Sequence, residues 1–281
     1  MIYIVVPTYN RVKTCNDFVN NLYSQTYQDY HLILVDHGKT KTKITGEKIT
    51  TIESDVNGWA KAVNIGLRYI LKLKELSDDD LVLMINDDVT IPKDYFERII
   101  QSHLEKPDAI LGTCCIDKNT NKTLRVAIKL NRKKAKHVYL YQKINVDEIK
   151  DNYIESDVLT GKGTIIPVSV LKKIGLYNEE RLPHYKADHE LIWRAKKMGY
   201  PVYTSKKMRL YTLSDQKTAN GKEPFLKTVK FLYFDMRSTI NIRDCYRYAM
   251  LAYKWPYSWY FFILNFLRNT IGMLIDYFRT K

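Results

Sequence analysis

The sequence has few of the features that mark secreted or zinc-binding proteins. Its four cysteines, Cys15, Cys114, Cys115 and Cys245, follow none of the usual metal-ligand spacings, and two of them are adjacent. We therefore expect reduced thiols in a cytosolic protein. The chain opens on strand-like residues from Ile2 instead of an apolar leader segment, so we do not expect it to be translocated.

A long apolar run is also missing. The most apolar stretch, residues 257–267, is interrupted by Asn265 and followed by Arg268, whereas a membrane-spanning helix needs about 20 apolar residues. The net charge of the chain is +14, and residues 194–281 hold 17 Lys and Arg against 5 Asp and Glu. Basic and aromatic residues together favour a helix that lies on an anionic membrane surface. A helix packed on the protein's own core is the alternative.

What the sequence does contain is an alternation of strand-like and helix-like segments. Residues 2–6, 31–35, 81–85 and 109–115 are typical of buried strands, and Cys15, Phe18, Val19 and Leu22 share one face of a predicted helix. This alternation predicts an α/β fold with a doubly wound, mostly parallel sheet. In residues 117–153, short β-like runs alternate with polar turns, and this pattern predicts a small β-rich insertion. Within it, residues 131–136 are expected to form a solvated, mobile loop, or else a lid over a ligand.

An acidic motif follows one of the predicted strands. The apolar residues 81–85 run directly into Asn86, Asp87 and Asp88. Ligands of open α/β sheets bind at the carboxyl ends of strands, and adjacent carboxylates repel each other unless a cation joins them. The motif therefore indicates a divalent cation, Mn²⁺ or Mg²⁺, that carries phosphate groups.

Six segments, in this order, resemble motifs of the bacterial family 2 glycosyltransferases, enzymes with the GT-A fold that use nucleotide-sugars. They are residues 6–11, 34–38, 57–66, 86–88, 161–179 and 188–191. The resemblance implies donor-binding roles for Pro7, Thr8, Tyr9, Asn10, Arg11, Asp36, Asn57, Gly58, Lys61, Asn86 and Asp87. It implies that Asp88 binds the metal, and that Gly161, Lys162 and His189 lie on the acceptor side.

The same resemblance places the catalytic base at Asp188, with Glu190 as the rival. A carboxylate can take the proton of an acceptor hydroxyl as that hydroxyl attacks the anomeric carbon. A single base and direct displacement imply inversion at that carbon. Asp188 also begins a predicted helix, where plain N-capping is an alternative role. For Asp36, the corresponding alternative to binding the imide of uracil or thymine is a turn or helix cap.

The sequence departs from the family pattern at two points. The first residue of the acidic motif is Asn86, so one charge fewer meets the metal. Relatives often carry a late metal-binding histidine, but the matching position here is near residues 210–212, and no histidine follows His189. We therefore expect weaker metal binding, and His184 is not assigned to that role.

We expect two regions: a GT-A domain over 1–215, with a nucleotide-sugar half (1–115) and an acceptor half (116–215), and a basic, aromatic helical region over 216–281. The donor would be a UDP-hexose or dTDP-rhamnose type of sugar nucleotide. The acceptor would be a polyprenyl-diphosphate-linked glycan or polysaccharide at the inner face of the cell membrane, with no nucleic-acid partner. The alternatives are a non-enzymatic basic module that binds nucleic acid or anionic lipid, and a sugar nucleotidyltransferase, although no glycine-rich triphosphate loop is present.

Overall fold

A computed structural model describes residues 1–213 and 224–279. The strands are β1 (Ile2–Thr8), β2 (Tyr30–Asp36), β3 (Ile49–Glu53), β4 (Leu81–Met84), β5 (Val89–Thr90), β6 (Ile110–Asp117), β7 (Thr123–Arg125), β8 (Ala127–Asn131), β9 (Lys136–Leu140), β10 (Tyr153–Glu155), β11 (Thr164–Pro167) and β12 (Val202–Thr212). The α-helices are α1 (Val12–Tyr23), α2 (Trp59–Ile70), α3 (Tyr95–Glu105), α4 (Val168–Ile174), α5 (Ala187–Lys197), α6 (Phe225–Phe234), α7 (Ile242–Ala252) and α8 (Tyr257–Arg279), and Val146–Glu148 form a short 3₁₀ helix.

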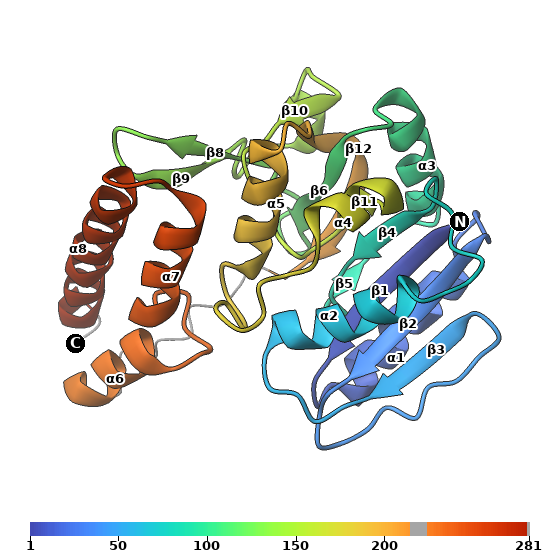
Figure 1. The fold of residues 1–281 in the computed structure, drawn as a ribbon, viewed down its shortest axis with the longest axis horizontal. Coiled ribbons are helices and arrows are strands. Elements are labelled where there is room, and N and C mark those ends of the chain that lie inside the picture. Colours follow the sequence, from blue (N-terminus) through green and yellow to red (C-terminus); the bar gives the residue numbers. More distant parts are fainter. Residues whose placement is uncertain (214–223, 280–281) are drawn as a thin grey trace.

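One mixed sheet forms the centre of the molecule, in the order β10-β12-β6-β11-β4-β1-β2-β3 (Figure 1). Strands β4, β1, β2 and β3 are parallel, whereas β11 runs antiparallel between β4 and β6. Helices α1 and α3 pack on one face of the sheet, and α2, α4 and α5 pack on the other. The predicted α/β fold with helices on both faces is confirmed.

The pattern of apolar residues explains how each element packs. In β1, Ile2 and Ile4 face the cluster beneath α1 and α3, while Tyr3 and Val5 face the opposite cluster. This alternation is what a strand covered on both faces requires. The four residues predicted to share one face of the first helix, Cys15, Phe18, Val19 and Leu22, are the buried residues of α1.

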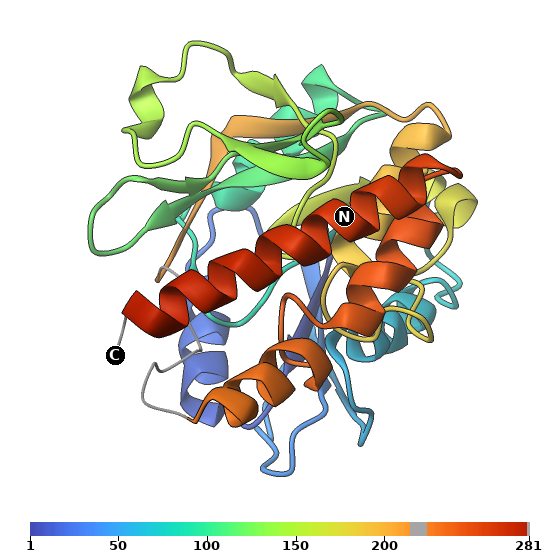
Figure 2. The same cartoon turned by 90° about the vertical axis from the view of Figure 1, so that its left-hand side faces the viewer.

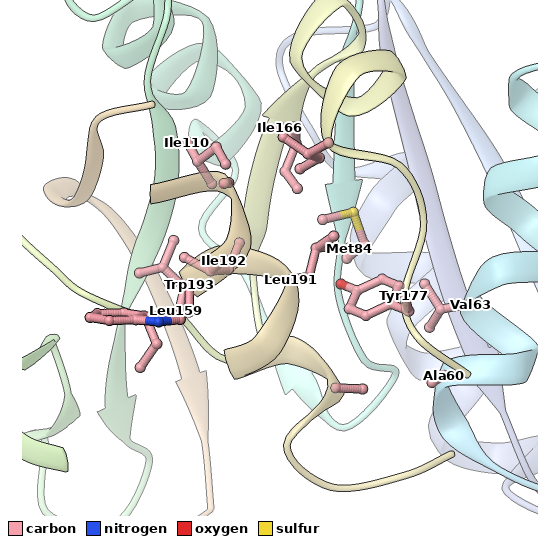
Figure 3. Packing of buried hydrophobic residues seen from close by; sticks show 14 of the residues in the cluster. Ala60, Val63, Met84, Ile110, Leu159, Ile166, Tyr177, Leu191, Ile192 and Trp193 are labelled. Carbon is pink, nitrogen blue, oxygen red and sulfur yellow. The ribbon is translucent and has the colours of Figure 1, made fainter. Parts of the chain in front are cut away.

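Helix α5 is held against the sheet by its own apolar face. Leu191 points from this helix toward Met84 of β4, and Ile192 and Trp193 belong to the same buried cluster, with Trp193 on the side away from Met84 (Figure 3). The indole Nε1 of Trp193 also donates a 2.7 Å hydrogen bond to the carbonyl of residue 252, at the end of α7. This packing fixes the first turn of α5, where Asp188 lies.

The C-terminal helix is longer than the apolar stretch 257–267 noted in the sequence. Helix α8 continues through Asn265 and Arg268 to Arg279. Both polar residues find partners, because Asn265 Nδ2 and Arg268 Nη1 donate to the carbonyl of Ala135. Figure 2 shows α8 crossing one side of the molecule, beside α7 and below the β8–β9 hairpin.

The turn of that hairpin was expected to be a solvated, mobile loop, or else a lid. Residues 132–134 are exposed, as a solvated turn requires, and the mobility of the turn remains a prediction. Its backbone carbonyls are used to hold α8. The hydroxyl of Tyr257 donates to the carbonyl of Arg132 at 3.1 Å, and Tyr260 donates to Lys133 at 2.5 Å. The hairpin and α8 therefore form one packed unit. No helix in the described ranges is long and apolar enough to cross a membrane.

Candidate active site

Asp87 joins the carboxyl ends of two neighbouring strands, since β1 and β4 pair in parallel. Its Oδ2 accepts a 2.7 Å hydrogen bond from Thr8 Oγ1, and its Oδ1 lies 2.6 Å from Arg11 Nη2. Burial raises the pKa of Asp87, while the Arg11 charge and the Thr8 hydrogen bond oppose that rise. Asp87 is fully buried and positions Thr8 and Arg11.

Asp88 is the acidic residue of this motif that lines a cavity. Its Oδ2 lies 3.3 Å from Lys162 Nζ and 3.7 Å from Arg11 Nη1. Its Oδ1 is buried and accepts no hydrogen bond from any residue in 1–213 or 224–279. The hydroxyl of Thr212 donates to the backbone carbonyl of Asp88 at 3.2 Å. One carboxylate oxygen of Asp88 is therefore paired with cations, and the other lacks a partner within this part of the chain.

Trp59, the first residue of α2, orients Asn86. Its indole Nε1 donates a 3.0 Å hydrogen bond to Asn86 Oδ1, and its backbone N–H donates to His184 Nδ1 at 3.3 Å. The indole also lies against Gly161, where any Cβ atom would overlap it. Trp59, Asn86, Gly161 and His184 form one wall of the cavity.

Asp36 organises the loop that follows β2. Its Oδ1 accepts a hydrogen bond from the N–H of Gly38 at 3.1 Å, and its Oδ2 accepts one from Thr42 at 2.6 Å. Asn10 has φ of 53° and accepts a 3.0 Å hydrogen bond from the N–H of Thr40. The loops after β1 and β2 are thus bonded to each other. Asp36 does not line the cavity, and its contact with a nucleobase remains a prediction.

The other residues expected at the donor site also surround this edge without lining the cavity. Pro7 lies within β1, and the ring of Tyr9 lies 5.2 Å from the ring of His37 at a tilt of 47°. Asn57 is exposed, Gly58 has φ of 121° and lies against Pro183, and Lys61 Nζ lies 3.4 Å from Glu180. Their roles in donor binding remain predictions.

Asp188 lies half-buried at the start of α5 and faces the cavity. Its Oδ2 accepts a 3.2 Å hydrogen bond from the N–H of Gly161, and its Oδ1 accepts a 2.8 Å bond from the N–H of His189. Burial raises the pKa of Asp188 above its usual value, although both hydrogen bonds favour the charged form. A raised pKa makes this carboxylate a stronger base.

Glu190, the rival base, is occupied elsewhere. Both of its carboxylate oxygens are bonded by Arg194, one turn later on α5. Glu190 is buried and does not line the cavity. This geometry favours Asp188.

The cavity that holds Asp88 and Asp188 has a volume of about 850 Å³. It extends from the sheet edge to the C-terminal helices, which sequence motifs did not connect with the site. Its lining there includes His137, Tyr248, Phe261, Phe262 and Asn265. The sheet edge and the C-terminal helices therefore share one cavity. The aromatic residues of α8 were noted in the sequence, but only for membrane contact.

Two histidines in this cavity are held neutral. The rings of His137 and His189 lie 5.0 Å apart, edge to face. Burial lowers the pKa of His137 to about 2 and that of His189 to about 3. His137 Nε2 lies 3.2 Å from the hydroxyl of Tyr248, whereas His189 Nδ1 is buried without a hydrogen bond within the described ranges. His189 therefore presents a neutral imidazole beside Asp188, on the predicted acceptor side.

The residues at Asp88 fit a metal ion only as a single protein ligand. No group of three His, Cys, Asp or Glu side chains suited to a metal occurs in residues 1–213 and 224–279. Thr212 stands where a late histidine was sought, and Asn86 Oδ1 is bonded to Trp59. The partnerless Oδ1 of Asp88 suits an ion that arrives with a diphosphate, because Mg²⁺ often uses one carboxylate plus phosphate oxygens.

Solved structures share this fold. GalNAc-T7 with UDP, GalNAc and Mn²⁺ aligns with a TM-score of 0.59 at 11% identity, over 92% of this chain and 52% of that one. The mannosyltransferase PcManGT from Pyrobaculum calidifontis, in complex with GDP-Man and Mn²⁺, aligns with a TM-score of 0.53 at 14% identity, over 99% and 86%. These similarities confirm the GT-A fold.

Sequence comparison identifies the family. An uncharacterized glycosyltransferase of Rickettsia typhi is 22% identical over 228 residues, which is 78% of this chain and 66% of that protein. The chain thus spans slightly less than two thirds of this relative's length. Residues 3–175 match the sequence model of Glycosyl transferase family 2. The match covers more than half of the chain and includes the strand ends that carry Thr8 and Asp88, and we conclude that the protein belongs to Glycosyl transferase family 2.

Proposed function

We propose that this protein is an inverting glycosyltransferase that moves a sugar from a nucleotide-sugar to a hydroxyl group. One observation carries the proposal. Gly161 and Lys162 are adjacent in sequence, and they contact Asp188 and Asp88 respectively, at 3.2 Å and 3.3 Å, in one cavity. A donor diphosphate beside Asp88 and an acceptor hydroxyl beside Asp188 would therefore lie in the same site.

The reaction follows from this arrangement. The acceptor oxygen attacks the anomeric carbon while Asp188 takes its proton, and the bond from that carbon to the diphosphate oxygen breaks. A base near its operating pH is the more effective one, and burial raises the pKa of Asp188 in that direction. A single displacement inverts the anomeric carbon. Family membership favours this function over a non-enzymatic basic module or a nucleotidyltransferase.

The donor is a UDP-hexose or a dTDP-rhamnose type of nucleotide-sugar, with Asp36 at the base end and Arg11 at the phosphate end. Mn²⁺ or Mg²⁺ would be held by Asp88 and would supply positive charge to the departing diphosphate. Arg11 is itself held in place by buried Asp87, at 2.6 Å. The chain therefore supplies a fixed guanidinium at this point with or without the ion.

The acceptor is a lipid-linked or cell-surface glycan, and the protein lies on the inner face of the membrane. The support is a stripe of exposed apolar residues along α8, each between 43% and 69% exposed: Tyr260, Ile263, Leu267, Ile271, Ile275 and Phe278. Beside it, the hairpin turn presents the exposed residues Arg132, Lys133 and Lys134. An apolar stripe next to basic residues suits an anionic bilayer surface, and the opposite side of α8 contributes Phe261 and Asn265 to the cavity.

A thermal-shift panel tests the proposal. The protein is heated with UDP, dTDP and GDP and their sugar conjugates, with and without Mn²⁺. A ligand at about 100 times its Kd stabilises the folded state by about 2.7 kcal/mol, so at least one nucleotide should raise the melting temperature by several degrees. The Asp188→Asn variant should respond as the wild type does. If no nucleotide stabilises the protein in either condition, the proposed function is wrong.

A further inference from the structure

A lysine lies between the acidic motif and the end of β12. Lys162 Nζ is 3.3 Å from Asp88 Oδ2 and 3.4 Å from the hydroxyl of Thr212. The Lys162 side chain is only 11% exposed. The Thr212 hydroxyl donates in turn to the backbone carbonyl of Asp88. The ammonium group of Lys162 thus connects Asp88, which follows β4, with Thr212, the last residue of β12. Lys162 itself lies just before β11.

A second cation, Arg11, lies in the same group. Its guanidinium forms ion pairs with Asp87 Oδ1 at 2.6 Å and with Asp88 Oδ2 at 3.7 Å. Within the described part of the chain, the two carboxylates of the motif therefore face the guanidinium of Arg11 and the ammonium of Lys162. Adjacent carboxylates repel each other unless cations are near, and here the chain provides those cations itself. Lys162 and Arg11 both line the cavity, so both can reach a ligand there.

We propose that Lys162 is a resident cation for the leaving diphosphate, so that this active site binds nucleoside diphosphates without a divalent ion. The inference rests on the proposed function and gives Lys162 a donor-side role instead of the acceptor-side role expected from the sequence. When the bond from the anomeric carbon to the phosphate oxygen breaks, its electron pair stays on that oxygen. A fixed cation aimed at this developing charge stabilises the transition state.

The side chain of Lys162 can contact Asp88 and a phosphate group at the same time. A lysine ammonium carries three donors on a flexible stem, so it can keep its contact with Asp88 while donating to a phosphate oxygen. Charge-assisted hydrogen bonds of this kind are roughly twice as strong as neutral ones. Asp88 holds the ammonium in place, and Asp88 Oδ1, which has no hydrogen-bond partner among the described residues, is left for a metal ion or a sugar hydroxyl.

Calorimetric titration tests the inference without any enzymatic assay. UDP, dTDP and GDP are titrated into the full chain, first with EDTA and then with Mn²⁺. The wild type should bind one of them in EDTA within about tenfold of its affinity in Mn²⁺. Lys162→Met should weaken binding in EDTA by about tenfold or more, which is the loss expected for a charge-assisted contact. Lys162→Arg should restore most of that loss.

A matched control separates this effect from a general loss of charge. Lys172 on α4 also pairs with an acidic residue, Asp78 at 2.6 Å, but it does not line the cavity. Lys172→Met should bind nucleotide as the wild type does. Circular dichroism melts identify any variant that fails to fold. If Lys162→Met does not fold, Lys162→Arg serves as the test in its place, and it should retain nucleotide binding in EDTA.

The outcomes distinguish this inference from the function on which it rests. Nucleotide binding that appears only with Mn²⁺ would overturn the role of Lys162 while leaving a metal-dependent transferase intact. Equal binding by the wild type and Lys162→Met in EDTA would also overturn it. The absence of binding in both conditions would overturn the inference and the proposed function together.

Discussion

Arg194 donates hydrogen bonds to both carboxylate oxygens of Glu190, at 3.0 Å and 3.1 Å, within one turn of α5. Arg194 Nη2 also donates to the carbonyl of Leu176 at 2.8 Å, and Nη1 donates to Ile174. The pair therefore ties α5 to the segment that follows α4. Two residues earlier, Asp188 accepts hydrogen bonds from the backbone N–H groups of Gly161 and His189 and faces the cavity. Two acidic residues of one helical turn thus have different surroundings.

The first prediction concerns the base. Asp188→Asn should lower kcat by about a hundredfold or more, because general-base catalysis contributes roughly 10²–10⁴ in rate. Donor affinity should stay within about twofold, since Asp188 acts on the acceptor proton. Steady-state kinetics with titration of the donor nucleotide provides the measurement. Normal turnover would move the base to another residue.

Glu190→Gln should act on stability. The substitution removes the charge that Arg194 faces in a largely buried site, and hydrogen bonds to charged groups contribute about 1.5–3 kcal/mol. We expect the free energy of unfolding in urea to fall by about 1–3 kcal/mol. The kcat per folded molecule should change by less than about threefold. A hundredfold loss of kcat in a folded variant would instead assign Glu190 to catalysis.

The raised pKa of Asp188 gives a pH dependence with a definite sign. A carboxyl whose pKa is higher in the folded than in the unfolded state stabilises the fold at low pH, and that contribution is lost as pH rises through the folded pKa. The melting temperature of the wild type relative to Asp188→Asn should therefore fall as the pH rises above the ordinary aspartate pKa of about 4. Activity should rise over the same range as Asp188 ionises. A melting-temperature difference that does not change with pH would contradict this account.

The α8 stripe should bind anionic membranes. Replacing both Leu267 and Ile271 by Glu puts two negative charges on an exposed apolar surface, so co-sedimentation with anionic phospholipid vesicles should fall at least about tenfold. Leu104→Glu is the control, because Leu104 is 74% exposed on α3, outside the stripe. Unchanged vesicle binding by the double variant would exclude α8 as the membrane surface.

Asp88→Ala should remove the part of nucleotide binding that Mn²⁺ adds, because Asp88 is the only protein ligand proposed for the ion. It should also abolish transfer. Titrations with and without Mn²⁺ measure the difference directly. If Mn²⁺ strengthened nucleotide binding equally in Asp88→Ala and wild type, the metal ligand would lie elsewhere.

Local patterns were sufficient to predict the N-terminal half of the fold. Strands β1, β2 and β4 are continuous apolar runs, and α1 buries the four residues that its spacing indicates. Strand β12 was missed because Lys206 and Lys207 interrupt its pattern. In the structure the pairing of β12 with β6 shifts register between Ser205 and Arg209, which accommodates this interruption.

Long-range contacts explain the rest. Asn265 and Arg268 interrupt and end the apolar stretch of the last helix, and in the structure they bond to the carbonyl of Ala135, more than 100 residues earlier in the chain. His137 and His189 meet in the cavity only because the β8–β9 hairpin packs beside α5 and α7. The partnership of Lys162 with Asp88 is likewise tertiary. A single sequence carries no local signal for any of these contacts.

The most direct test of the central claim is a crystal structure of the protein with the nucleotide-sugar that the thermal-shift panel selects. We predict that the diphosphate lies beside Lys162, Arg11 and Asp88, and that the anomeric carbon faces the carboxylate of Asp188 across the cavity. A donor bound outside this cavity, or with its anomeric carbon turned away from Asp188, would contradict the account.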